Sequence, residues 1–129
     1  MGKLLSPQVV YIVEDDDDVR GGFSRLVRSA GLEARPYESA ERFLNEVVDG
    51  ERACILLDIT MPLLTGIQVQ ERLNARHIAL PVITISARDD DDTRRIAREL
   101  GARLFLRKPV DDQALLDAIN WATGFSLGR

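Results

Sequence analysis

Short apolar segments recur along the chain at intervals that suit β-strands. Residues 8–13 (QVVYIV) form a run rich in β-branched side chains, and residues 53–58 (ACILLD) and 80–86 (LPVITIS) are similarly apolar. Each run is short and lacks polar alternation, so each predicts a strand that is buried on both faces. Two weaker segments, residues 32–37 and 103–106, predict the second and the fifth strand.

Between these segments, apolar residues recur every three or four positions, which predicts five amphipathic helices. Ser39 is the expected N-cap of the second helix, and Gly31 and Gly101 are stop signals after the first and the fourth. The apolar positions are Val19, Phe23, Leu26, Val27 and Ala30 in the first helix; Phe43, Leu44, Val47 and Val48 in the second; Ile67, Val69 and Leu73 in the third; Ile96, Ala97 and Leu100 in the fourth; and Leu115, Leu116, Ile119 and Ala122 in the fifth.

Five strand–helix units in succession predict an α/β protein. Strands that are apolar on both faces belong to a parallel sheet with helices on both sides. Right-handed crossovers then give an open, doubly wound five-stranded sheet. We expect residues 1–129 to form a single domain with its core at about residues 8–122, because most domains have about 100–150 residues.

Composition narrows the class of protein. The chain of 129 residues is 45% hydrophobic and 29% charged with a net charge of −4, which disfavours nucleic-acid binding over its whole surface. No apolar stretch approaches the roughly 18 residues that span a bilayer, so we expect no membrane segment. Cys54 is the single cysteine and excludes an internal disulfide. This cysteine usage is typical of a cytoplasmic protein.

Acidic residues gather in two runs, residues 14–18 and 89–92, which together hold nine of the 21 carboxylates. Such clusters need water, helix N-termini or cations to relieve their repulsion. For Asp17 and Asp18 we expect a helix N-terminus, and the same explanation is preferred for residues 90–92; a second metal site there is the less favoured alternative. Glu14 and Asp15 need a different explanation, because they directly follow the first strand.

Polar residues follow four of the predicted strands. Glu14 and Asp15 follow the first strand, Asp58 ends the third, Ser86 ends the fourth, and Lys108 follows the fifth. Because the carboxyl ends of parallel strands share one edge of the sheet, these residues are expected to converge there. Three carboxylates need a counter-charge, and Mg²⁺ suits them best. A metal, an ammonium and a hydroxyl form a clamp for a phosphoryl group, which Asp58 can accept as an acyl phosphate.

Four motifs carry a resemblance to a known family. They are VEDDDD after the first strand, LLDITMPLLTG around Asp58, TISA around Ser86, and FLRKP around Lys108. Over roughly residues 8–122 the chain resembles the receiver domain of bacterial two-component response regulators, with the layout of the FixJ/LuxR-type branch. The resemblance implies a flavodoxin- or CheY-like fold with strand order 2-1-3-4-5.

The resemblance also implies roles at the expected site. Asp58 would be phosphorylated by a sensor histidine kinase. Asp15 would bind Mg²⁺ directly, Glu14 would act beside it partly through water, and Thr60 would offer its backbone carbonyl to the metal. Mn²⁺ is a second candidate for the same site. Thr60 and Arg88, which flank the site, are expected to tune the access of hydrolytic water.

A conformational switch is implied at the later strands. Ser86 and Lys108 would hold the phosphoryl oxygens, and Ser86 and Phe105 would move when the phosphoryl group arrives. The altered surface would be the fourth helix, the fifth strand and the fifth helix, where arginines and acids mix and could support a phosphorylation-dependent homodimer. We also expect a cis bond between Lys108 and Pro109.

Members of this branch usually precede a helix-turn-helix output domain. Such a domain is not expected within residues 1–129, so this domain would control transcription without contacting nucleic acid itself. It would also dephosphorylate itself rather than act as a conventional enzyme.

Two other functions remain open at this point. One is a phosphotransferase or phosphatase with an aspartyl nucleophile for small molecules; Thr60 stands where such an enzyme would need a second acid, and no cap segment is large enough to bind a substrate. The other is a degenerate receiver that acts as a phosphorylation-independent dimerisation or binding module. Against it, every position of the expected site carries a competent residue type.

Overall fold

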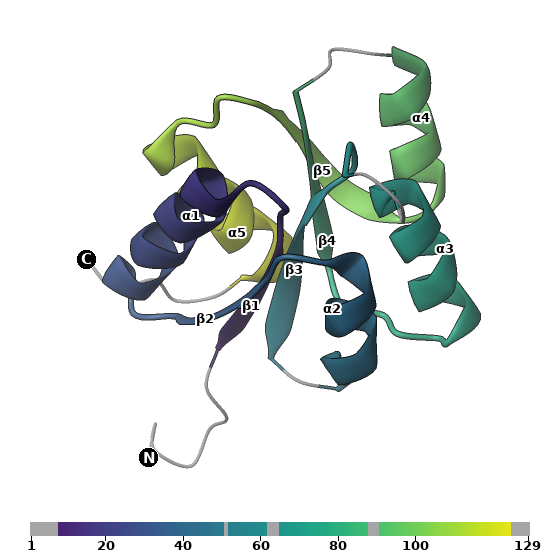
Figure 1. Ribbon diagram of the computed structural model, residues 1–129, viewed down its shortest axis with the longest axis horizontal. Helices are drawn as coiled ribbons and strands as arrows, with labels where there is room; N and C mark the ends of the chain where they lie inside the picture. The colour runs from purple at the N-terminus through teal and green to yellow at the C-terminus, as the bar shows by residue number, and fades with distance from the viewer. Residues whose placement is uncertain (1–7, 51, 62–64, 88–90, 125–129) are drawn as a thin grey trace.

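The computed structural model describes residues 8–50, 52–61, 65–87 and 91–124. Five parallel strands form one sheet in the order β2-β1-β3-β4-β5, as predicted (Figure 1). The strands are β1 (Val9–Val13), β2 (Glu33–Tyr37), β3 (Ala53–Asp58), β4 (Val82–Ser86) and β5 (Ala102–Arg107). The helices are α1 (Asp17–Ser29), α2 (Ala40–Glu46), α3 (Gly66–Ala75), α4 (Asp91–Glu99) and α5 (Asp112–Thr123).

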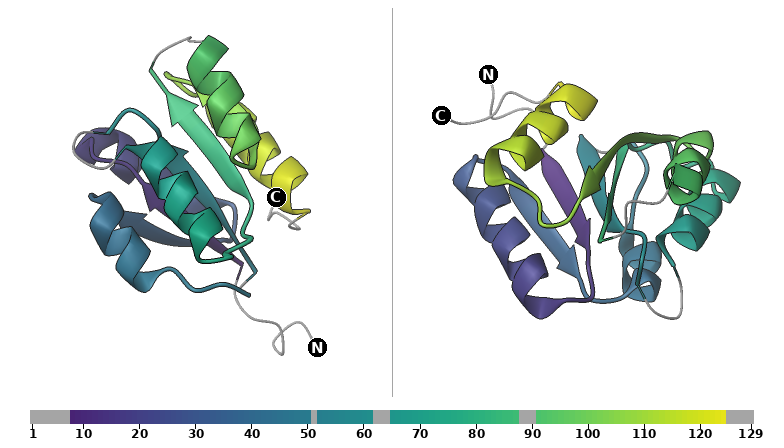
Figure 2. Two further views of the ribbon diagram at one scale, coloured as in Figure 1. Left: turned by 90° about the vertical axis from the view of Figure 1, so that its right-hand side faces the viewer. Right: turned by 90° about the horizontal axis from the view of Figure 1, so that it is seen from above.

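Helices cover both faces of the sheet. Helices α1 and α5 lie on one face, and α2, α3 and α4 lie on the other (Figure 2). Successive residues of a strand point to opposite faces, so each central strand supplies both cores. On β1, Tyr11 belongs to the core beneath α2 and α3, whereas Ile12 belongs to the core beneath α1 and α5. This division explains why the central strands are apolar without alternation.

The helix starts follow from side-chain caps. Asp16 is the N-cap of α1 and accepts a hydrogen bond from the Val19 amide at 3.0 Å, so Asp17 and Asp18 occupy the first turn, as predicted. Asp91 and Asp92 likewise lie in the first turn of α4. Asp89 and Asp90, the other members of that acidic run, lie outside the described residues.

The predicted apolar face of the second helix is too long. Ser39 caps α2 as expected and accepts a hydrogen bond from the Arg42 amide. The helix ends at Glu46, however, and Val47 has an extended backbone. Val48 therefore lies beyond the helix, and 56% of its surface is exposed. The sequence periodicity continued past the point where the chain leaves the helix.

Two smaller expectations concern burial. Cys54 is fully buried in β3, and this burial raises the pKa of its thiol to about 12, as expected for an inert core cysteine. Within the described residues, the helices are too short or too polar to cross a lipid bilayer.

Candidate functional site

The strand register brings the predicted polar residues to one edge of the sheet. Val13, the last residue of β1, pairs with Leu57 of β3, so Glu14 leaves the sheet beside Asp58. Asp58 in turn pairs with Ile85 of β4, one residue before Ser86.

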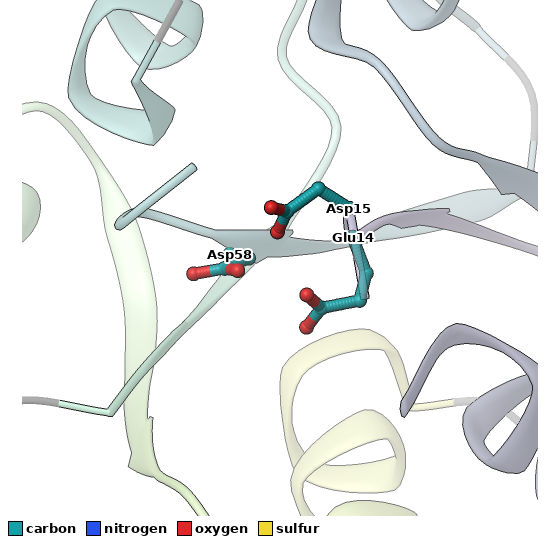
Figure 3. Close-up of side chains that lie close together, drawn as sticks. All are labelled: Glu14, Asp15 and Asp58. Carbon is teal, nitrogen blue, oxygen red and sulfur yellow. The ribbon is translucent and has the colours of Figure 1, made fainter. Parts of the chain in front are cut away.

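Three carboxylates converge at this edge, from β3 and from the connection between β1 and α1 (Figure 3). One oxygen each from Glu14, Asp15 and Asp58 lies within 4.8 Å of the other two. The side chains of Glu14 and Asp58 are buried, whereas that of Asp15 is exposed. The cluster is therefore closed on the protein side and open to solvent at Asp15.

Lys108 supplies positive charge to the cluster. Its Nζ lies 2.7 Å from Glu14 Oε1 and 3.3 Å from Asp58 Oδ2. Only the approach to Asp58 has the geometry of a hydrogen bond, so Glu14 Oε1 has an ionic contact and no hydrogen bond within the described part of the chain. The backbone N–H of Lys108 donates to the Ser86 carbonyl at 2.8 Å. The Lys108–Pro109 peptide bond is cis, as predicted.

The two buried carboxyl groups titrate differently. Burial raises the pKa of Glu14 to about 7, and the nearby Asp58 adds to this effect, while Lys108 opposes it. Burial also acts on Asp58, but hydrogen bonds from Thr60 and Glu14 and the charge of Lys108 together hold its pKa below the ordinary value. Burial works against the ammonium of Lys108, yet its two acidic partners raise its pKa. Asp58 is thus the carboxylate that stays ionised at neutral pH.

Thr60 contacts Asp58 in a way that the sequence did not reveal. Its backbone N–H and its Oγ1 both donate to Asp58 Oδ1, at 2.9 and 2.8 Å. These bonds fix the carboxylate plane and favour its charged form. The expected contribution of the Thr60 carbonyl to a metal ion stays a prediction. Arg88, the other residue expected to flank the site, lies outside the described residues, as do residues 62–64 of the motif that follows Asp58.

The two residues expected to act as a switch lie on β4 and β5. Ser86 is fully buried at the end of β4. Phe105 is partly buried in the middle of β5, where it pairs with Thr84 and packs against the core beneath α2 and α3. The guanidinium carbon of Arg94 lies 5.1 Å from the centre of the Phe105 ring, which is a cation–π contact.

Arg20 is a further residue of this region that sequence reasoning missed. Its guanidinium contacts the backbone carbonyls of Glu14 and Asp15 and the side chain of Asp17. The spacing of Asp17 and Arg20, three residues apart on one helix, was a visible signal for the ion pair. The carbonyl contacts depend on the path of the connection between β1 and α1 and had no sequence signal.

A cavity borders the cluster on the side of α1. It has a volume of about 760 Å³ and lies between α1 and the connection from β5 to α5. Val19, Phe23 and Leu26 line it from α1, and Lys108 and Pro109 line it from the other side.

The donor set at this edge fits a hard divalent cation. All three converging donors are carboxylate oxygens, which Mg²⁺ and related ions prefer, and one of the donors is open to solvent. Lys108 alone cannot balance three carboxylates. The same edge offers an ionised carboxylate beside an ammonium, an arrangement that can receive and hold a phosphoryl group.

Comparisons with known proteins show what this chain is similar to. The family model described as the response regulator receiver domain matches residues 10–120. The chain is 38% identical to the transcriptional regulatory protein TdiR of Thauera aromatica. The aligned region of 113 residues covers 88% of this chain and 50% of TdiR. The chain is also 37% identical to the transcriptional regulatory protein FixJ of Azorhizobium caulinodans. The aligned region of 117 residues covers 91% of this chain and 56% of FixJ.

The structural comparison gives the same result. The solved structure of the response regulator StyR superposes with a TM-score of 0.86 at 38% identity, over 92% of this chain and 60% of StyR. The chain therefore spans about half the length of the curated relatives that it matches.

Proposed function

This chain belongs to the family of response regulator receiver domains, and from that premise we propose that Asp58 accepts a phosphoryl group from a sensor histidine kinase. The observation that carries the proposal is the position of Lys108 Nζ, 2.7 Å from Glu14 and 3.3 Å from Asp58. This ammonium lies where an incoming phosphoryl group would need charge compensation. We further propose that residues 1–129 act as a single receiver domain with a core at about residues 8–122.

The transfer would replace one phosphorus bond with another. The carboxylate of Asp58 attacks the phosphorus of a phosphohistidine, a phosphorus–oxygen bond forms, and the phosphorus–nitrogen bond breaks. The released imidazole takes a proton from solvent. Asp58 suits the role of nucleophile because its pKa is held below the ordinary value, so it is ionised when the kinase arrives. Lys108 and Ser86 would then hold the phosphoryl oxygens.

A divalent cation is the expected cofactor. The carboxylates of Glu14, Asp15 and Asp58 and the carbonyl of Thr60 would hold Mg²⁺, with Mn²⁺ as a second candidate. The ion would neutralise negative charge on the phosphoryl group during transfer. The three carboxylate oxygens within 4.8 Å of one another support this assignment.

The phosphorylated domain would also return to its resting state unaided. Water attacks the phosphorus of the acyl phosphate, inorganic phosphate leaves, and the carboxylate of Asp58 is restored. Thr60 would influence this step, because its N–H and hydroxyl already hold one oxygen of Asp58. The domain is thus a signalling protein with self-phosphotransfer and autodephosphorylation, not an enzyme with a separate substrate.

The signal would leave the site through β4 and β5. The phosphoryl group would draw the hydroxyl of Ser86 towards Asp58, and Phe105 would turn inwards into the released space. That rotation would end the cation–π contact with Arg94 and alter the surface formed by α4, β5 and α5. Arginines and acids mix on α4, which supports a phosphorylation-dependent homodimer through this surface.

The output would be transcription, since TdiR and FixJ are named as transcriptional regulatory proteins. The net charge of −4 argues that this domain itself does not contact nucleic acid, and we propose that it acts in the cytoplasm, away from the membrane.

Acetyl phosphate with Mg²⁺ tests the proposal directly. We expect stoichiometric addition of one phosphoryl group, detected by mass spectrometry, that requires Mg²⁺ and is lost in Asp58→Asn. Absence of labelling in the folded protein would instead favour a phosphorylation-independent dimerisation or binding module. Repeated turnover of a small phosphate ester would favour an aspartyl phosphatase.

A further inference from the structure

Arg20 contacts the backbone that carries two of the expected metal ligands. We infer that Arg20 is a positioning residue for the divalent cation: it holds the peptide groups of Glu14 and Asp15 so that their carboxylates face Asp58. This role presupposes the phosphoacceptor site proposed above. It concerns a residue that touches none of the three clustered carboxylates.

The contacts of Arg20 are directed at main-chain oxygens. Arg20 Nη1 donates to the carbonyl of Glu14 at 2.9 Å and to the carbonyl of Asp15 at 3.4 Å, while Nη2 donates to Asp17 Oδ1. The Arg20 side chain is only 18% exposed. A planar guanidinium can serve several acceptors in one plane, so a single side chain holds consecutive peptide groups and the first turn of α1 together.

The other hydrogen bonds of this connection hold Glu14 and Asp16 but not Asp15. The N–H of Glu14 donates to the carbonyl of Tyr37 at 3.1 Å, which extends the pairing of β1 with β2 by one residue. The N–H of Asp16 donates to Glu14 Oε2 at 3.2 Å, and the Asp16 side chain caps α1. Within the described residues, the bond from Arg20 is the one hydrogen bond that fixes Asp15. Asp15 is also the exposed member of the carboxylate cluster, so its orientation is not determined by packing.

Two positively charged residues contact the connection between β1 and α1 from different sides. Lys108 lies on the carboxylate side of the cluster, where a metal ion or phosphoryl group competes for the same oxygens. Arg20 lies on the carbonyl side and leaves the oxygens of Glu14, Asp15 and Asp58 available. A positive charge near a cation site should by itself weaken cation binding. Positioning by Arg20 should strengthen cation binding, whereas its charge should weaken it. A change in affinity therefore distinguishes the two effects.

The test is a Mg²⁺ titration of the unphosphorylated domain, followed by calorimetry and by the amide NMR shifts of residues 14–16. We expect Arg20→Ala to weaken Mg²⁺ binding by about 10- to 100-fold, the range typical for residues that orient metal ligands. Arg20→Lys keeps the charge but offers no planar fork, so we expect it to weaken binding by a smaller but measurable factor.

Arg25→Ala is the matched control. Arg25 is an exposed arginine on the same helix, and its side chain has no hydrogen bond or ion pair within the described part of the chain. Its loss removes the same charge without altering the connection between β1 and α1, so its Mg²⁺ affinity should equal or slightly exceed that of the wild type. Circular dichroism at the titration temperature verifies that each variant is folded. If Arg20→Ala does not fold, Arg20→Lys decides the question.

Each result has a defined meaning. Folded Arg20 variants that bind Mg²⁺ as tightly as the wild type, or more tightly, would overturn the positioning role and leave the proposed function intact. A wild type that binds no Mg²⁺ would overturn both. Weakened binding in both Arg20 variants, with faster amide hydrogen exchange at Asp15 and Asp16 in the absence of metal, supports the role.

Discussion

Two buried carboxyl groups in one cluster have pKa values shifted in opposite directions. Both side chains are almost fully buried, Glu14 at 1% and Asp58 at 3% exposure, so burial alone does not separate them. The difference arises from hydrogen bonding and coupling. Thr60 donates two hydrogen bonds to Asp58 and none to Glu14, and the interaction between the two carboxyl groups lowers the pKa of Asp58 while it raises that of Glu14. Asp58 is consequently held in its ionised form, as the proposed nucleophile must be, while Glu14 has a pKa of about 7 and can carry a proton.

This difference predicts a pH-dependent stability. Because burial raises the pKa of Glu14 from 4.5 to about 7, the folded state binds a proton that the unfolded chain has released. The associated stability is fully present below about pH 4.5 and is lost as the pH rises through about 7. We expect Glu14→Gln, which resembles the protonated form, to gain stability relative to the wild type between pH 5 and pH 8. Urea unfolding with a metal chelator measures the difference, and a difference that does not change with pH would contradict this account.

The roles of single residues were predictable to different degrees. The sequence indicated Glu14, Asp15, Asp58 and Lys108, because a parallel sheet brings the carboxyl ends of its strands together. It did not indicate the hydroxyl contact of Thr60 or the carbonyl contacts of Arg20. Those depend on rotamers and on the path of a short connection, neither of which leaves a periodic pattern.

At the scale of elements, burial on both faces made the central strands visible in the sequence. The predicted strands at residues 53–58 and 8–13 differ from the structure by at most one residue at either end. The end of α2 was less predictable, since Val47 and Val48 continue the apolar pattern after the backbone has become extended. The spacing of hydrophobic residues therefore predicts that a helix is present more accurately than it predicts the residue at which the helix ends.

Gly66 at the start of α3 shows how an element can constrain the site. Thr65 caps this helix together with Gln68, and the cap brings Gly66 against the end of β3. A Cβ at this glycine would lie 2.5 Å from the Cα of Ile59 and 2.8 Å from the carbonyl oxygen of Asp58. Both neighbours are backbone atoms, which cannot move aside without displacing Asp58.

We expect Gly66→Ala to lower the free energy of unfolding by about 1–3 kcal/mol, as overpacking in a core does. It should also slow the proposed labelling of Asp58 by acetyl phosphate, because the backbone of Asp58 would shift. Gly22→Ala on α1 is the control, since a Cβ there meets only the end of the Arg25 side chain at 3.9 Å. That control should stabilise α1 by roughly 0.5–1 kcal/mol and leave labelling unchanged. Equal effects of the two substitutions in chemical unfolding would refute the steric explanation.

Helix α4 buries little apolar surface. Ala97 is its buried residue, and two amides of α3 hold its C-terminal end. Gln70 Nε2 donates to the Ala97 carbonyl and Asn74 Nδ2 to the Leu100 carbonyl, both at 2.9 Å. A helix with so little apolar burial can change position at a small cost in free energy. The element that the proposed switch must move is therefore one that the core holds weakly.

At the scale of the whole molecule, two helical layers enclose the sheet and leave the site at its edge. The number of strands, the parallel pairing and the helices on both faces followed from hydrophobic pattern and right-handed crossovers. The strand order 2-1-3-4-5 required the family resemblance, because pattern alone does not fix on which side each crossover is placed. The structure confirms that order.

We predict that two copies associate through the proposed surface formed by α4, β5 and α5. On α4, Arg94, Arg95 and Arg98 share a helix with three acids, and Ile96 is 37% exposed between them. We expect beryllofluoride with Mg²⁺ to induce a dimer in sedimentation velocity experiments. Arg98→Glu should weaken that dimer by about tenfold or more, because it places like charges in contact. Arg28→Glu on α1 is the control for charge and should have no effect. A fluoride complex that stays monomeric would exclude this output.

The backbone and the side chain of Lys108 contact different residues of the site. Its main-chain N–H is bonded to the carbonyl of Ser86, while its ammonium lies between Glu14 and Asp58. The attachment to the sheet thus does not depend on what the amine touches. If a cation bound the three carboxylates as proposed, the Lys108 side chain would be free to turn to a new anion while β4 and β5 stay in register. Because only the backbone of Lys108 is bonded to β4, its side chain could change partners between the proposed metal-free and phosphorylated states without breaking a hydrogen bond of the sheet.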